Sequence, residues 1–314
     1  MNSPDSRNKK NGFVSHSKQD NVEQKPASQQ KAAASSAPEN TQGSGDSRQA
    51  KINLPTGGGA IRGIGEKFEA NPVTGTASFS VPIALSEGRD GFTPQLSLNY
   101  DSGSGNSVFG LGWSIGLPSI TRKTDKELPR YDDNLISESD TFILSGAEDL
   151  VPLLDAAGNR IVRSENGYDI YSYLPRTEGL FALIERWEEQ STRISHWRSV
   201  SRDNITSVYG FGSIARIADP DHPRKVFSWM VEESWDAKGN LMRFIYRPED
   251  SMNVPESCFE HHRIERNIFA NHYLKEVLYG NASPIALSYT PCSYGGSFYF
   301  RLRFDYGDEN GTWP

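Results

Sequence analysis

The chain has 314 residues, 36% of them hydrophobic and 23% charged, which allows one large or two ordinary domains with a substantial buried core. Its net charge of −7 is uneven, because residues 1–50 carry a net +2 and the remainder −9; an acidic body argues against a nucleic-acid surface, which needs clustered Lys and Arg. No stretch approaches the roughly 18 apolar residues of a membrane span, and no apolar segment follows the basic N-terminus as it would in a Sec signal peptide.

The first 50 residues have the composition of a disordered segment. They contain no Leu, Ile, Trp or Tyr and are dominated by Ser, Gln, Asn, Ala and Lys. Such a segment buries too little apolar surface to offset the entropy of ordering its backbone. We therefore expect a disordered leader over residues 1–50, either solvated or used as a docking tail, and one β domain over residues 51–314.

Short alternating segments predict a mainly β fold after the leader. Residues 77–85 and 96–100 alternate apolar and polar side chains, and together they predict a hairpin with a long loop. Further short strands, aromatic and bounded by turn residues, are expected at 141–154 (a hairpin), 168–175, 180–187, 194–201, 207–212 and 298–306. Residues 181–190 also fit a helical turn. The expected fold is a curved, multi-stranded sheet of short antiparallel strands.

Two kinds of turn recur between these strands. The sequence Asp-Ala-x-Gly-Asn occurs at 155–159 and again at 236–240, where Asp can bond to the backbone ahead and Gly-Asn tolerates a positive φ. Tyr-Gly pairs stand at the ends of expected strands, at 209–210, 279–280 and 306–307. Recurring turns and aromatic residues are typical of stacked β arrays, in which each unit buries its face against the next.

Ser114 is the one candidate nucleophile. Residues 112–116 fit G-x-S-x-G, the elbow that presents the serine of many hydrolases, but that elbow needs a buried strand before the serine and a helix after it. The preceding residues are too rich in glycine for a central strand, and residues 119–122 predict another strand. We expect Ser114 to be structural, in a glycine-rich crossing at 103–116 where Phe109 and Trp113 fill gaps. Hydrolysis at Ser114 is the remote alternative.

Cofactor and metal sites find little support. The glycine-rich stretch 57–68 fits neither G-x-x-x-x-G-K-[ST] nor G-x-G-x-x-G, and a close approach of two backbones explains its glycines better. Cys258 and His261 have the spacing of zinc ligands, but a tetrahedral site needs more partners. The remaining candidates near them are His262, His272 and Cys292. We expect solvent-facing loop histidines and two ordinary thiols in the core or on the surface instead, with a Cys258–Cys292 bridge as the alternative and no bound cofactor or metal.

Paired carboxylates and the remaining histidines also lack a catalytic pattern. His196 and His222 have no second ligand near them in sequence and are assigned to the same solvent-facing class. Glu188–Glu189 and Glu232–Glu233 are adjacent, so in strands their side chains point to opposite faces and cannot form an acid/base dyad. We expect these glutamates to be solvated. No catalytic residue is predicted, and the chain is expected not to be an enzyme.

Several long blocks nevertheless resemble one known family, in order and over nearly all of residues 51–314. The blocks are LPTGGGAIRGIGEKFEANPVTGTASFSVPI, GFTPQLSLNYDSGSGNSVFGLGWSIGLPSITR, YGFGSIARIADP, DAKGNLMRFIYRPED and YLKEVLYGN. They resemble the SpvB-type domain that begins the B subunits of bacterial insecticidal toxin complexes (Tc toxins) and virulence-plasmid ADP-ribosylating toxins. The Asp-Ala-x-Gly-Asn and Tyr-Gly elements are similar to the tyrosine-aspartate (RHS) repeats of the same proteins.

The resemblance implies a structural role in toxin delivery. In toxin-complex B subunits this domain forms β-sheet in the wall of a hollow shell, which a C-type RHS subunit completes and from which an A-type pore subunit translocates the toxic polypeptide. The ADP-ribosylating relatives carry an E-x-E catalytic pair in a separate C-terminal domain, and E-x-E occurs nowhere in this sequence. We expect a non-enzymatic wall domain from a truncated or fragmentary toxin protein, since no A-binding propeller follows.

Partners and localisation follow as expectations from the same resemblance. The partners would be a C-type RHS toxin subunit and an A-type translocation subunit, with no nucleic acid and no stable membrane insertion. The protein would be made in the bacterial cytoplasm, where it could also be stored, and secreted without a Sec signal peptide. The alternative function is the N-terminal export or carrier domain of an ADP-ribosylating virulence toxin, and a lectin-like surface module is a weaker one.

Overall fold

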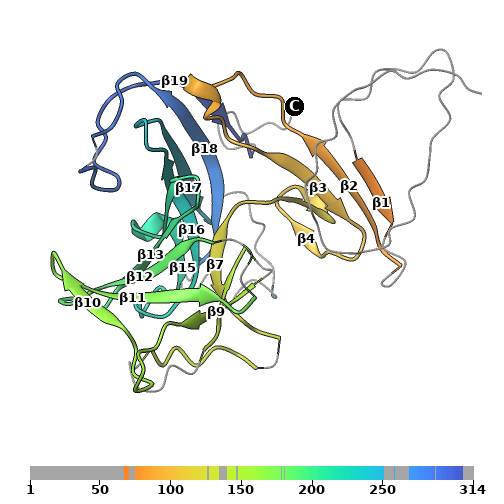
Figure 1. The fold of residues 1–314 in the computed structure, drawn as a ribbon. Helices are drawn as coiled ribbons and strands as arrows, with labels where there is room; N and C mark the ends of the chain where they lie inside the picture. Colours follow the sequence, from red (N-terminus) through yellow and green to blue (C-terminus); the bar gives the residue numbers. More distant parts are fainter. Residues whose placement is uncertain are drawn as a thin grey trace, which may run out of the picture. The chain divides into compact units, whose positions relative to one another are not determined.

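The computed structural model describes residues 67–70, 75–125, 127–133, 140–145, 148–177, 179, 181–250, 258, 269–286 and 288–306 (Figure 1). The chain divides into two units, Met1–Arg48 and Gln49–Pro314. The expected leader lies outside the described residues, so its disorder stays a prediction. Within the described part of the chain, no helix has the length and hydrophobicity needed to cross a membrane.

Among the described residues of the second unit, the regular secondary structure is almost entirely β-strand, which confirms the expected fold class. The strands are β1 (Lys67–Ala70), β2 (Ala77–Pro82), β3 (Ser97–Asp101), β4 (Asn106–Ser107), β5 (Gly110–Leu111), β6 (Trp113–Ile115), β7 (Ser119–Arg122), β8 (Phe142–Leu144), β9 (Glu148–Pro152), β10 (Val162–Glu165), β11 (Tyr168–Pro175), β12 (Leu183–Glu189), β13 (Ser195–Val200), β14 (Thr206–Tyr209), β15 (Arg216–Ala218), β16 (Val226–Trp235), β17 (Leu241–Pro248), β18 (His272–Asn281) and β19 (Phe298–Arg303). Two short 3₁₀ turns, η1 (Arg89–Gly91) and η2 (Ser213–Ala215), interrupt them.

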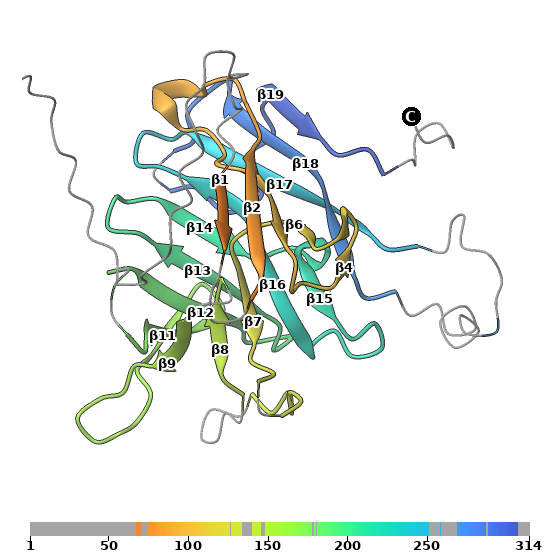
Figure 2. The same cartoon turned by 90° about the vertical axis from the view of Figure 1, so that its right-hand side faces the viewer.

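The larger sheet closes on itself. Its strands follow the order β14-β13-β12-β11-β9-β8-β7-β16, and β14 also pairs with β16, so these eight strands form a closed ring. From β16 the sheet continues as an open arm through β17 and β18 to β19, which Figure 2 shows side by side. A smaller sheet has the order β1-β2-β3-β6. Every pairing in both sheets is antiparallel, as the short alternating segments predict.

The expected hairpins are confirmed. β2 pairs with β3, placing Phe79 opposite Tyr100, and residues 83–96 form the long loop between them. β8 pairs with β9 across the expected second hairpin. Residues 183–189, for which a helical turn was the alternative, form strand β12. In β19 the outward residue Tyr299 is 73% exposed, while Phe300 packs against the core.

Four aromatic side chains fill the interior of the ring. Trp197 on β13 and Trp229 on β16 are fully buried, with ring centroids 6.0 Å apart. Phe142 lies 4.9 Å from Trp197 and 5.7 Å from Trp229, and Tyr173 lies 4.8 Å from Trp197. Aromatic residues remove the most apolar area from water per side chain, so this cluster dominates the energetics of the ring. The Trp229 indole also donates a hydrogen bond of 2.7 Å to the Ser195 carbonyl.

The repeated Asp-Ala-x-Gly-Asn turns are confirmed and have the same geometry. In both, the Asp Oδ1 accepts the backbone N–H groups of the residues two and four positions further on. Gly158 has φ of 85° and Gly239 has φ of 81°, values that residues with a side chain rarely adopt. Asp155 and Asp236 therefore set two turns that reverse the chain between neighbouring strands.

The Tyr-Gly pairs let an aromatic ring pack onto bare backbone. Gly210 and Gly280 both have positive φ, 64° and 66°. A Cβ on Gly210 would lie 2.5 Å from Cδ1 of Trp229, and one on Gly280 would lie 2.8 Å from Cδ2 of Phe300. The third pair extends to residue 307, which lies outside the described residues. Glycine is needed at both described positions, because the ring occupies the space of a side chain.

Gly210→Ala should therefore destabilise the domain. Gly158→Ala is the matched control, because it has a similar φ but nothing within 4 Å of its added Cβ. Both variants should lose stability because alanine disfavours a positive φ. Gly210→Ala should lose about 1–3 kcal/mol more, the usual cost of overpacking a core. Urea unfolding at pH 7 measures the difference. Equal losses in the two variants would contradict the packing role of Gly210.

Candidate functional site

A layer of buried charge lies at one end of the ring. On β7, Arg122 follows Ile120 on the inward face, and on β12, Arg186 and Glu188 follow Ile184. Side chains two residues apart in a strand share a face, so these charges point to the same side as the aromatic core. The side chains of Arg122, Arg186 and Glu188 are 0%, 1% and 3% exposed. Buried charges of this kind persist only when they are paired.

Every side-chain nitrogen of Arg122 donates a hydrogen bond. Its two terminal nitrogens donate to the two carboxylate oxygens of Asp133, each at 2.7 Å, a bidentate pair. One of them also donates to Asp140 at 2.8 Å, and the Nε donates to the Val226 carbonyl at 2.7 Å. The guanidinium lies over the rings of Phe142 and Tyr131, 5.1 and 4.9 Å from their centroids. Arg122 therefore ties the inner wall of the ring to the loop that carries Asp133.

From Asp133 the charges alternate outward to the surface. The Arg186 guanidinium lies 3.8 Å from Asp133 and 2.6 Å from one oxygen of Glu188. The other Glu188 oxygen lies 2.7 Å from Arg193, whose side chain is 40% exposed. The network thus leads from the dry interior to solvent, with each charge next to one of opposite sign. This arrangement offsets the cost of desolvating the inner members.

The same network sets the protonation of Asp133. Burial alone would raise the pKa of this carboxyl, but the hydrogen bonds from Arg122 and the positive charges of Arg186 and Arg122 outweigh it. The net effect lowers the pKa of Asp133 below its ordinary value. Asp133 is therefore ionised throughout the neutral range, as its bidentate contact requires.

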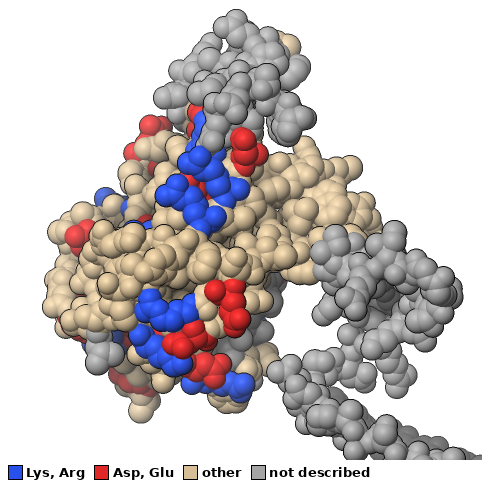
Figure 3. Space-filling view, turned by 90° about the horizontal axis from the view of Figure 1, so that it is seen from above, with Lys and Arg blue, Asp and Glu red and all other residues tan. Residues whose placement is uncertain are grey.

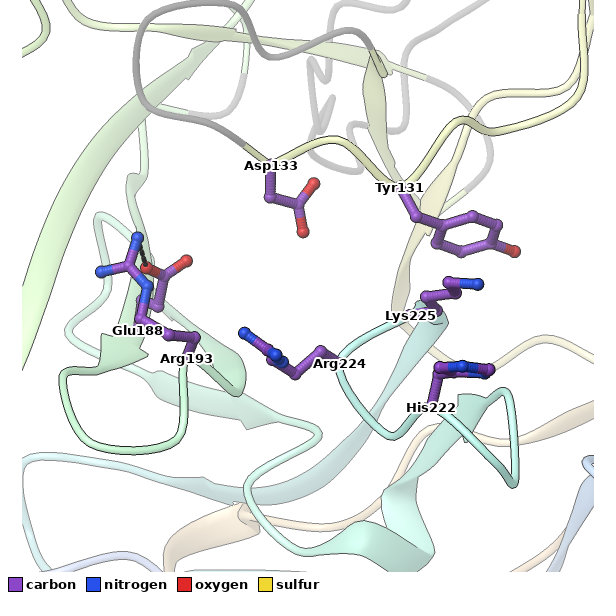
Figure 4. Close-up of a pocket in the computed structure, with 7 residues that line it drawn as sticks. All are labelled: Tyr131, Asp133, Glu188, Arg193, His222, Arg224 and Lys225. Atoms are coloured by element: carbon purple, nitrogen blue, oxygen red, sulfur yellow. Dashed lines mark ion pairs between the residues drawn. The ribbon is translucent and has the colours of Figure 1, made fainter.

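A charged cleft opens above this network, with a volume of about 400 Å³ (Figure 4). The described residues that line it are Tyr131, Asp133, Glu188, Arg193, His222, Arg224 and Lys225. They come from the loop after β7, the end of β12, the β12–β13 turn and the loop after β15. None of these residues is Ser, Thr or Cys, so the lining includes no ordinary hydroxyl or thiol nucleophile. The excess of cationic groups suits the binding of an anion.

Ser114 lies away from this cleft. It is the exposed middle residue of β6 and stands opposite Asn99 of β3. Strand β7 follows it, whereas a nucleophile elbow passes into a helix. A Cβ on Gly112 would lie 2.6 Å from a ring carbon of Tyr100, so the glycine does permit a close crossing. Trp113 packs against Tyr100, and Phe109 fills a second gap beside Phe304 and Tyr306.

The candidate metal and phosphate residues are only partly described. Residues 57–66, His261 and His262 lie outside the described residues. Cys258 and Cys292 are both free thiols, as expected, and both are exposed. His272 begins β18, and among described residues no group of three His, Cys, Asp or Glu could hold a metal ion. Their proposed ligand set is therefore not assembled from the described residues.

The expected solvent exposure of His196 is wrong. It lies on β13 and is 4% exposed, packed between the rings of Trp187 and Phe211. Burial lowers its pKa to about 3, so the imidazole is neutral at physiological pH. His222, in contrast, is an exposed loop residue with its Nδ1 3.1 Å from Asp219.

The expectation that the adjacent glutamates are solvated is wrong for three of the four, whereas Glu189 is partly exposed. Glu188, Glu232 and Glu233 are 2%, 8% and 0% exposed. The pairing of β14 with β16 passes from Val208↔Glu233 to Tyr209↔Val231, so Glu232 is the extra residue of a β-bulge. A bulge interrupts the alternation of side chains. The argument that adjacent residues must face apart therefore fails at Glu232.

Both glutamates consequently contact Cys292. Its backbone N–H donates to Glu233 at 2.8 Å, and its thiol hydrogen-bonds to Glu232. Glu233 is further held by Arg243 at 2.7 Å and by the Tyr289 hydroxyl at 2.9 Å. Burial raises the pKa of Glu232. Although Cys292 as a residue is exposed, partial desolvation of its thiol and the nearby glutamates raise the pKa of that thiol. A protonated thiol is a poor nucleophile, so the cluster is a structural tie rather than an activated cysteine.

Sequence reasoning missed the residues of the cleft. One available signal was the segment LIERWEE, in which charged residues occupy inward positions of an apolar strand. A second was the run His222-Pro-Arg-Lys225, which gathers cations on a turn. Neither signal identifies partners, because Arg122, Asp133 and Glu188 come from different elements that only the closed ring brings together.

Comparisons with known proteins agree with the fold. Residues 71–314 match the family described as Salmonella virulence plasmid 65kDa B protein. The mono(ADP-ribosyl)transferase SpvB of Salmonella typhimurium is 34% identical over 267 residues, which cover 82% of this chain and 42% of that protein; the SpvB of Salmonella dublin matches equally well. The chain thus spans less than half the length of these curated relatives.

Solved structures are similar as well. The N-terminal domain of the effector protein SpvB from Salmonella typhimurium has a TM-score of 0.64 at 32% identity, covering 74% of this chain and 75% of that one. A chain of the TcdB2-TccC3 crystal structure has a TM-score of 0.66 at 31% identity, covering 82% of this chain and 12% of that one. The Tc holotoxin pore of Photorhabdus luminescens contains a chain with the same scores.

Asp133→Asn should destabilise the domain by roughly 3 kcal/mol at pH 7. This value is at the lower end of the range for removing one partner of a buried ion pair, because Asp140 still pairs with Arg122. The folded pKa of Asp133 is lowered, so its stabilisation is complete above the unfolded pKa of about 3.9 and is lost as pH falls further. Urea unfolding at pH 7 and pH 3 should show the wild-type advantage shrinking with acid. Asp203→Asn, at an exposed turn, is the control; an advantage that is unchanged at pH 3 would contradict this account.

Ser114 should not react as a catalytic serine. A fluorophosphonate probe added to the folded chain should give the same background labelling in the wild type and in Ser114→Ala, as measured by intact-mass spectrometry. Stoichiometric labelling that the substitution abolishes would revive the hydrolase alternative.

Proposed function

Because the chain belongs to the SpvB family of virulence and toxin proteins, we propose that it is a structural, non-enzymatic domain that helps to enclose and deliver a toxic polypeptide. Its partners under this proposal are a C-type RHS subunit and an A-type translocation subunit. The matched structures of toxin complexes support such an assembly. Secretion from the bacterium without a Sec signal peptide is part of the same proposal.

The open edge of β19 is the observation that carries this proposal. Among the described residues β19 pairs only with β18. The Phe304 N–H donates to the Lys275 carbonyl at 2.9 Å, so by alternation the N–H groups of Phe300 and Leu302 point toward β18. Those of Tyr299 and Arg301 point the other way. No described strand pairs with this edge, and an open strand edge is a template for a further strand, as continuation of a sheet wall requires.

An exposed apolar row lies on the outer face of the ring. Leu174 on β11 stands opposite Val151 on β9, and the β11–β12 register places Leu183 on its other side. These side chains are 41%, 40% and 50% exposed, respectively. Contiguous apolar side chains on a sheet face are typical of protein contact surfaces. On the face drawn in Figure 3, basic and acidic side chains form mixed groups around a broad uncharged area, which also suits contact with protein.

The non-enzymatic part of the proposal rests on the chemistry of the buried groups. The ionised Asp133 and the protonated Cys292 are engaged in structural contacts, and E-x-E is missing from the sequence. The relatives named mono(ADP-ribosyl)transferase are more than twice as long as the part this chain matches. Their activity is therefore not carried over to this chain.

The second candidate function is the export or carrier domain of an ADP-ribosylating virulence toxin. It is favoured by the match to the SpvB N-terminal domain, of which this chain covers 75%. An E-x-E pair encoded downstream in the same reading frame would select this alternative. The strand edge and the apolar row serve either role, since both need contacts with another polypeptide.

Arg301→Pro tests the open edge. The Arg301 N–H points away from β18, so proline removes an edge donor without breaking the β18–β19 ladder. Arg301→Ala is the matched control, because both variants lose the exposed side chain and its 3.6 Å contact with Glu276. Each form is co-expressed with the products of its neighbouring genes, and complexes are measured by size-exclusion chromatography and mass spectrometry.

Wild type and Arg301→Ala should co-elute with a large RHS protein, whereas Arg301→Pro should elute alone while retaining its circular dichroism spectrum. Co-elution of all three would show that assembly does not use this edge. A wild-type chain that elutes only as a monomer with every neighbouring product would overturn the shell role.

A further inference from the structure

Arg224 is the one charged residue of the cleft lining without a partner among the described residues. Asp133 pairs with Arg122, Glu188 with Arg186 and Arg193, and both His222 and Lys225 contact Asp219. Arg224 is exposed, and its guanidinium points toward the middle of the cleft, between the Glu188–Arg193 pair and the His222 side (Figure 4). Five N–H donors in a fixed fork are thus presented to the cavity.

The groups around Arg224 favour an anion over a cation. Arg193 and Lys225 also line the cleft, with side chains 40% and 47% exposed. The acidic members of the lining are engaged: Asp133 by the bidentate contact with Arg122, and Glu188 by an arginine on each of its oxygens. The cleft therefore offers free donors but few free acceptors. This local cationic character contrasts with the net charge of −7 of the chain.

The wall of the cleft is held in a strained conformation. Tyr131 has φ of 57° and Arg193 has φ of 60°, a region that residues with a side chain seldom adopt. Asp140 accepts the Tyr131 N–H at 2.9 Å, and the pair with Glu188 holds Arg193. Strained backbone of this kind persists where its surroundings fix it, and it is frequent at binding sites. Contacts within the fold therefore fix the backbone at two positions of the lining.

We propose that this cleft binds an oxyanion, a carboxylate or phosphate group that the Arg224 guanidinium holds in bidentate geometry, while Arg193 and Lys225 add positive charge to the lining. The planar fork of arginine matches both groups, whereas a lysine acts as a point charge. The two sources of this chemistry are the carboxylates of an acidic peptide segment and a free phosphate ion. Anion binding here is independent of the shell role, because the cleft lies at the charged end of the ring and not at the edge of β19.

The test is isothermal titration calorimetry of the full chain with two probes, inorganic phosphate and an acetylated, amidated hexaglutamate peptide. Arg224→Gln removes the fork at a side chain that contacts no other described group, so folding should be unchanged, as the melting temperature will check. Arg202→Gln is the matched control, an arginine on another exposed turn with a side chain 74% exposed. Arg224→Lys keeps the charge and loses the fork.

At least one probe should bind saturably with one site per chain. Arg224→Gln should weaken that binding by about tenfold or more, a change of about 1.4 kcal/mol, Arg224→Lys by less, and Arg202→Gln should leave it unchanged. Preference for the peptide would assign the site to an acidic polypeptide segment, and preference for phosphate would assign it to a small ion. Absence of saturable binding by both probes, or equal weakening by Arg224→Gln and Arg202→Gln, would overturn the proposal.

Discussion

The structure depends on strand β16, which serves two sets of neighbours. Its first half pairs with β7 and β15, and its second half with β14 and β17. The bulge at Glu232 lies between these halves, where a strand can bend and twist. If β16 did not pair with both β7 and β14, the strands from β7 to β14 would form an open sheet. With it, the strands close around Trp197 and Trp229, and the sheet still continues outward to β19.

Closure explains why charged residues can occupy inward positions. Arg122 is fully buried at one end of the ring, so protein groups and not bulk water must neutralise its charge. Alternating charges neutralise the buried ions. Each ion has a counter-ion within hydrogen-bond distance, from Asp140 through Arg122 and Asp133 to Glu188. Such a network adds little net stability over apolar packing but fixes a single arrangement, which holds the loop of Tyr131 over the cleft.

The fold separates two kinds of surface that a delivery protein would need. The edge of β19 and the outer apolar row offer contacts that extend over strands, where affinity comes from backbone bonds and buried area. The charged cleft is a small cavity, where selectivity comes from a few hydrogen-bond donors at fixed positions. Because the two lie on different parts of the ring and its arm, each can be altered without the other.

The sequence alone determined the local structure of this protein, whereas the tertiary structure decided its buried charges. Period-two alternation and Asp-x-x-Gly turns depend on neighbouring residues, so strands β2, β11 and β19 and the turns at Asp155 and Asp236 were predictable. The burial of Glu232 and His196 was not, because it depends on a bulge and on rings from distant strands. The cleft was likewise hidden, since Asp133, Glu188 and Arg224 come from elements that are distant in the sequence and line one cavity only in the closed ring. The family could be recognised from long sequence blocks that occur in the same order, whereas the geometry of a site could not be predicted from them.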